Sequence, residues 1–236
     1  MAFTSMPEQS GLARSLFIAL CLGLLLLGYG LIRYRSMLVF SGQGLLFAGL
    51  LLLLTIIFAV YAFVGREISE GFGRDEIWAQ QQGMNFGLFG SLFLGAEAVV
   101  DNILPDFNFA IAVACALGLL MVQFIAGLYG ARHTRSLSFG LRIGLWSGML
   151  SSLIAWIVLL VMTYILMPLL QNYPRYIQAF AHSGTSDITT YIVKNAIVAA
   201  TSYLVIGPVM GLAFGALGAL PGKVLASRKP TPQLEK

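Results

Sequence analysis

The feature that most constrains the fold is a series of long apolar stretches almost free of charged side chains. Residues 109–130 contain no charge, and residues 141–168 and 188–220 contain one each, Arg142 and Lys194. About 20 such residues in a helix match the thickness of the hydrocarbon core of a bilayer. A helix also satisfies its own backbone hydrogen bonds, which lipid cannot do. The pattern therefore predicts an all-α, polytopic transmembrane helix bundle.

The composition supports a lipid environment. Hydrophobic residues make up 58% of the 236-residue chain and charged residues only 10%, whereas soluble domains have about 25% charged residues. So few charges could not cover a water-facing surface, and we expect a multi-pass protein of the cell (plasma) membrane. The net charge is +4, but the basic residues flank apolar runs, as membrane orientation requires. Nucleic-acid binding is therefore not expected.

Six spans are predicted in a single domain, residues 1–222. They cover residues 16–32, 37–64, 84–103, 109–130, 141–168 and 188–220. The basic tail, residues 223–236, contains prolines and is predicted to be disordered. The polar connector between the second and third predicted spans, residues 65–82, is predicted to be either an interfacial helix or solvated chain.

The number of spans depends on residues 84–104, whose apolar core is short and contains Glu97. If this stretch crosses the membrane, there are six spans and both termini lie on one side. If it is re-entrant or interfacial, there are five. The distribution of basic residues favours six by a small margin, and it predicts a cytoplasmic C-terminus in both arrangements. A re-entrant backbone would also need surrounding protein to satisfy its hydrogen bonds, so six spans are favoured.

Small residues recur at every fourth position in two of the predicted spans. One row is Gly140, Gly144, Gly148 and Ser152, and the other is Gly207, Gly211, Gly215 and Ala219. Such rows let helix backbones approach closely where hydrophobicity provides no drive for association. Both rows lie at a similar depth, so we predict that they face each other in a glycine zipper. The simplest role is packing within the chain, and the alternatives are a dimer interface or a sliding contact. Pro208 predicts a kink, either a hinge or a static bend.

Glu97 and Asp101 lie one helical turn apart and so share a helix face. Carboxylates inside a membrane span indicate a candidate ion or proton site. The alternative is that both side chains reach water at the outer interface and end the helix. Asn85 and Gln123 are further polar residues in apolar runs, and each is expected to hydrogen-bond to another helix.

Sequence motifs for catalysis are missing. There is no Walker A and no HExxH sequence, and no histidine in a later span could activate Ser147 as a nucleophile. His133 and His182 are predicted on opposite sides of the membrane, so they would not share a metal. Two cysteines in apolar runs predict buried, reduced thiols. We therefore expect no enzyme, no cofactor and no metal.

Three hypotheses for the function follow, of which a membrane enzyme has the least support because no paired nucleophile and base are visible. The first is an accessory or scaffold subunit that acts through helix–helix contacts, with other membrane subunits or a second copy as partner. The alternative is a small transporter or permease subunit, in which Glu97 and Asp101 line a cation or proton pathway.

Overall fold

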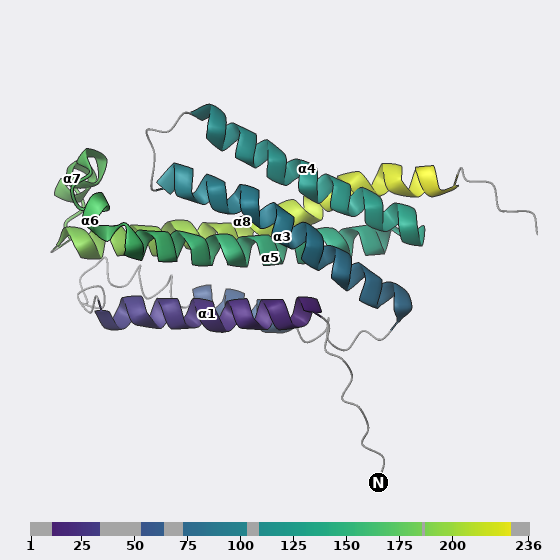
Figure 1. Cartoon of the computed structure of the whole chain (residues 1–236), viewed down its shortest axis with the longest axis horizontal. Helices are drawn as coiled ribbons and strands as arrows, with labels where there is room; N and C mark the ends of the chain where they lie inside the picture. Colours follow the sequence, from purple (N-terminus) through teal and green to yellow (C-terminus); the bar gives the residue numbers. More distant parts are fainter. Residues whose placement is uncertain (1–10, 34–52, 64–72, 103–108, 186, 228–236) are drawn as a thin grey trace, which may run out of the picture.

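The computed structural model describes residues 11–33, 53–63, 73–102, 109–185 and 187–227, and the regular structure in these residues is entirely helical. Five of the described helices are long and apolar enough to cross a membrane. They are α1 (Gly11–Arg33), α3 (Arg74–Asn102), α4 (Phe109–Thr134), α5 (Leu137–Ile165) and α8 (Ile188–Ser227). These helices lie side by side (Figure 1). The predicted multi-pass helix bundle is therefore confirmed.

The predicted second span, residues 37–64, is described only in part, as the short helix Leu53–Phe63. Residues 37–52 and 64 lie outside the described residues. In the short helix, Phe58 stacks edge-on against Trp156 of α5. Tyr61, one turn later, lies against Ser152, one turn earlier in α5. The short helix therefore runs antiparallel to α5.

The first helix, α1, runs in the same direction as α5. Gly23 of α1 lies against Trp156, and Gly30 lies against Tyr164. Because α1 and the short helix run in opposite directions, the short helix has the direction required of a membrane crossing between α1 and α3. The count of six spans itself stays a prediction.

The third helix differs from the expectation for residues 65–104. Residues 84–102 belong to a continuous helix that is long and apolar enough to span, which favours a crossing over the re-entrant or interfacial alternative for residues 84–104; residues 103 and 104 lie outside the described residues. The helix begins at Arg74, which places residues 74–82 in the same helix rather than in an interfacial helix or a solvated connector. Two acidic residues in the first turn stabilise the helix, because they lie at the positive end of its dipole. Glu76 also forms an ion pair with Arg142 of α5.

The last helix continues to Ser227, beyond the predicted boundary at residue 220. Lys223 is therefore helical and not part of a disordered tail, and residues 228–236 lie outside the described residues. Packing explains the extension, because Gly222 lies against the backbone of Leu128 in α4. This contact supports the helix past Pro221, whose ring removes one backbone hydrogen bond.

Two short helices, α6 (Met167–Leu170) and α7 (Pro174–Ala181), connect α5 to α8. The Asp187 side chain caps the start of α8, since it accepts hydrogen bonds from the backbone N–H and the hydroxyl of Thr190 at 2.7 and 2.6 Å. The pKa of Tyr176 in α7 is raised, mainly because its side chain is partly buried. The positive charge of Arg175 acts in the opposite direction, and Tyr191 adds to the rise.

The centre of the bundle is α5, which has the largest buried share of the five long helices. It packs against α8, α3 and α4, whereas α1 lies at the edge (Figure 1). The outer faces of α1 and α4 are apolar, with Leu25 72% and Met121 59% exposed. Lipid is the solvent that such faces require. Cys21 lies on the exposed face of α1, so the expected burial of this thiol is wrong, and both cysteines are free.

The helix directions predict how single cysteines will react with a membrane-impermeant thiol reagent. In a chain with both natural cysteines replaced by alanine, Asp75→Cys and Lys223→Cys should be labelled from the same side, which we expect to be cytoplasmic. Gln178→Cys in α7 should be labelled from the opposite side. Labelling of Asp75→Cys and Lys223→Cys from opposite faces of sealed vesicles would contradict the arrangement.

Candidate functional site

Direct backbone contact joins α5 and α8 along the two rows of small residues. A Cβ atom on Gly144 would overlap the carbonyl oxygen of Gly211 and lie 2.9 Å from the Cα atom of Gly215. A Cβ atom on Gly207 would lie 2.7 Å from the carbonyl oxygen of Gly148 and 2.5 Å from the Cβ atom of Ser152. These distances leave no room for a methyl group. The close approach is available only to residues without a side chain.

The first residue of the first row, Gly140, meets the last residue of the second row, Ala219. A Cβ atom on Gly140 would lie 2.7 Å from the Cβ atom of Ala219. It would also lie 2.7 Å from the carbonyl oxygen of Gly127, which belongs to α4. All eight residues of the two rows therefore lie in one continuous contact, and α4 joins it at this level.

Contact of α4 with α8 is as tight as that of α5 with α8. A Cβ atom on Gly127 would overlap the carbonyl group of Gly215, and one on Gly218 would overlap the carbonyl oxygen of Phe124. Gly222 lies one turn further along α8 against Leu128. The sequence contains a signal for this second contact, because Gly218 and Gly222 are also four residues apart. The predicted row of Gly207 faces mainly α5, although Gly215 of this row also meets α4.

The proline in α8 leaves a backbone carbonyl without its usual donor. Pro208 has no N–H, so it cannot donate to the carbonyl of Leu204 four residues earlier. The hydroxyl of Tyr61 donates to this carbonyl at 2.8 Å, and it also lies 2.8 Å from Ser152 Oγ. Both are buried side chains. Neighbouring helices commonly satisfy the groups freed by a proline in membranes, and here the short helix Leu53–Phe63 does so.

This bond bears on the hinge predicted at Pro208. The α-helix continues through the proline, and Gly207 beside it is in contact with Gly148 and Ser152 of α5. Two neighbouring helices therefore contact α8 just before the proline, and a hinge at Pro208 stays a prediction.

Three side chains in the core have no hydrogen-bond partner among the described residues for any of their polar atoms. They are the amide of Gln123, the hydroxyl of Ser147 and the indole N–H of Trp156. All three side chains are fully buried. The interhelical hydrogen bond expected for Gln123 is therefore not found in the described part of the chain. The side chain of Ser147 extends from α5 into the interior of the bundle, where a substrate could not reach it.

The two candidate carboxylates lie near the end of α3. Glu97 is partly buried, next to the fully buried Ala98, and it interacts with the rest of the protein. The backbone of Asp101 belongs to the same helix, while its side chain lies outside the described part of the structure. A shared pathway for Glu97 and Asp101 stays a prediction.

Asn85 lies on the outer face of α3 rather than between helices. It is exposed, and no hydrogen bond joins its side chain to another described residue. The residues that follow on this face, Leu88, Phe89 and Leu92, are exposed and apolar, whereas Gln81, one turn before Asn85, is exposed and polar. On the inner face, Gly83 and Gly87 flank this position and lie against Trp146 and Leu150 of α5. Asn85 is therefore at the depth of the glycine contact, in what we predict to be the cytoplasmic half of the membrane.

An aromatic cluster joins α3 and α4 at the end of the bundle where α5 begins. His133 stacks on Trp78 with ring centroids 4.0 Å apart, and Tyr129 lies 5.6 Å from Trp78. Beside this cluster, Arg142 and Glu76 form an ion pair at 2.5 Å. His182 lies in the connection after α7, in contact with Gln178. The described residues contain no cluster of His, Cys, Asp and Glu that could hold a metal ion.

Comparisons with protein families, with curated proteins and with solved structures find no significant match to this chain. Its function therefore has to be inferred from its own residues.

The glycine contact predicts a large difference between two identical substitutions. Gly144→Ala should lower the free energy of unfolding by about 1–3 kcal/mol, the usual cost of inserting a methyl group into a packed interior. Gly28→Ala in α1 is the matched control, because nothing lies within 4 Å of a Cβ atom there. It should have little effect, or stabilise slightly through the higher helix propensity of alanine. Unfolding in detergent measures both, and equal effects would contradict the assignment.

The bond between Tyr61 and Leu204 predicts a coupling that a double-mutant cycle can measure. Tyr61→Phe should cost about 1–2 kcal/mol, because the Leu204 carbonyl is left buried without a donor. In a Pro208→Ala background the new N–H bonds this carbonyl, so Tyr61→Phe should cost about 0.5–1 kcal/mol less.

Tyr29→Phe serves as the control for this cycle, since the Tyr29 ring is 54% exposed and contacts Tyr164 edge-on. It should show no dependence on residue 208. An equal cost of Tyr61→Phe in the two backgrounds would disprove the role of the freed carbonyl.

Proposed function

We propose that this chain is an accessory or scaffold subunit of a membrane assembly and acts through helix–helix contacts. The observation that carries the proposal is Asn85, an exposed carboxamide on the outer face of α3, where the residues that follow it are apolar and the exposed Gln81 lies one turn before it. An amide exposed to hydrocarbon without a hydrogen bond costs about 2–7 kcal/mol, depending on the reference state. A helix of another subunit, or of a second copy, would satisfy it, since such bonds stabilise helix association by about 1–2 kcal/mol in model peptides.

The packing of the core supports the same role. Backbone contact at Gly127, Gly144 and Gly215 holds α4, α5 and α8 together, and α3 packs against α5 and α4 with one face while its other face is exposed. Interiors packed in this way move as rigid bodies and do not deform continuously. A rigid core that presents an outer helix with a polar residue is suited to hold a partner in a constant position.

A photoreactive residue in place of Leu88 tests this proposal in the native membrane. Leu88 lies one turn from Asn85 and is 48% exposed. We expect a covalent adduct with a membrane polypeptide, and we expect Asn85→Leu to abolish it. The same residue in place of Leu25, on the exposed face of α1, is the positional control and should react mainly with lipid.

Asn195→Leu in α8 is the matched control variant, since Asn195 is an exposed asparagine close to the start of its helix. It should leave the adduct at residue 88 unchanged. If residue 88 reacts only with lipid, or if Asn85→Leu leaves the adduct intact, the scaffold proposal fails. Cation or proton flux through liposomes containing this chain alone, lost in Glu97→Gln, would instead favour the transport hypothesis.

A further inference from the structure

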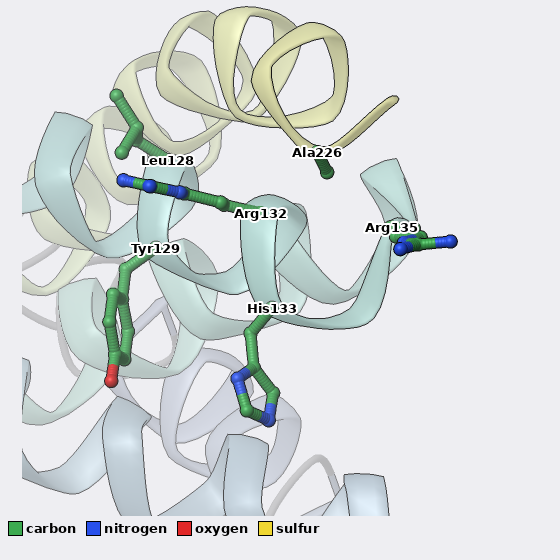
Figure 2. Close-up of a pocket in the computed structure, with 6 residues that line it drawn as sticks. All are labelled: Leu128, Tyr129, Arg132, His133, Arg135 and Ala226. Carbon is green, nitrogen blue, oxygen red and sulfur yellow. The ribbon is translucent and has the colours of Figure 1, made fainter. Parts of the chain in front are cut away.

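A cavity of about 350 Å³ lies between the last turns of α4 and the end of α8. Its lining residues are Leu128, Tyr129, Arg132, His133, Arg135 and Ala226 (Figure 2). Its position follows from the helix contact beneath it. Gly222 of α8 touches the backbone of Leu128, and the cavity lies next to this contact, where Ala226 is one turn further along α8.

The lining of this cavity changes in polarity along the helix axis. Leu128 and Tyr129 lie deeper in the predicted span, and Arg132, His133 and Arg135 follow at its end. Figure 2 shows the Arg132 side chain beside Leu128, between α4 and α8, whereas Arg135 points away from it. An apolar base with a cationic rim at the membrane surface matches the boundary between an acyl chain and a phospholipid headgroup.

The charge of this rim is not neutralised within the described residues. Neither Arg132 nor Arg135 forms an ion pair or hydrogen bond there, whereas the nearby Arg142 is paired with Glu76. Lys223 in α8 adds another exposed cation at this end of the bundle. Basic pockets between transmembrane helices on the cytoplasmic side are typical binding sites for anionic lipid headgroups.

We propose that this cavity binds the phosphodiester of an anionic phospholipid, with Arg132 as its principal contact and the acyl chain along Leu128. The Tyr129 side chain extends toward α3, away from Arg132 (Figure 2), so it contributes its ring to the lining and is not assigned to the phosphate. Arg135 points outward and contributes mainly through long-range attraction. The site is distinct from the face of α3 that carries Asn85, so it does not depend on the proposed scaffold function.

Tryptophan fluorescence offers a direct test on the full chain. Trp78 stacks on His133, one wall of the cavity, whereas Trp146 and Trp156 are buried in the core. Phosphatidylglycerol with brominated acyl chains is titrated into protein in phosphatidylcholine–detergent micelles. We expect it to quench Trp78 at lower mole fraction than brominated phosphatidylcholine does. Arg132→Gln should weaken this preference about fivefold, the effect expected for losing one cationic contact with an anionic lipid.

Two controls separate the possible outcomes. Arg175→Gln in α7, at the opposite end of the bundle, should leave the preference unchanged, and an unchanged unfolding temperature of Arg132→Gln shows that the variant is folded. Inorganic phosphate should compete only weakly, because it lacks the acyl chain. Equal quenching by both lipids, an unaltered preference in Arg132→Gln, or displacement of the lipid by phosphate at similar concentration would each overturn the proposal.

Discussion

Contact between the backbones of α5 and α8 is the interaction on which the rest of this bundle depends. Inside a bilayer, apolar side chains gain nothing by leaving lipid for protein, so association relies on close packing and on hydrogen bonds. Gly144 and Gly211 supply the first of these, since nothing larger than a hydrogen atom fits between their helices. Gly127 brings α4 into the same contact. The position of α3 and α1 then follows from the side chains that α5 presents, such as Trp146 against Gly83 and Trp156 against Gly23.

Hydrogen bonding has the second role, and it connects distant parts of the chain. Pro208 frees a carbonyl in α8, and Tyr61 in the short helix Leu53–Phe63 bonds it. A residue that weakens one helix thereby fixes the position of another. Ser151 acts similarly, since its hydroxyl lies within hydrogen-bonding distance of the carbonyl oxygen of Gly87 in α3. Inside the bilayer, where water is absent, the bond from Tyr61 is what satisfies the carbonyl freed by Pro208.

Local spacing made part of the fold predictable, and the limits of spacing explain the rest. The interval of four residues from Gly140 to Ser152 and from Gly207 to Ala219 indicated two helix faces, and the structure places them in contact. The same interval separates Gly218 and Gly222, which face α4, but spacing alone does not say which neighbour a second face of the same helix will meet. The start of α3 was misplaced because Arg74–Gln82 is polar in sequence, while its helix is supported by the distant Arg142.

The sequence by itself determined that this protein is a multi-pass helical bundle, because apolar length and scarcity of charge leave a chain no other way to satisfy its backbone in lipid. Only the tertiary structure decided which polar residues face inward and which face outward. Gln123 is enclosed and Asn85 is exposed, although both lie in apolar runs. Only the structure brought Arg132 beside the end of α8. These outcomes depend on the rotation of each helix against its neighbours, which is set by contacts between residues far apart in the chain.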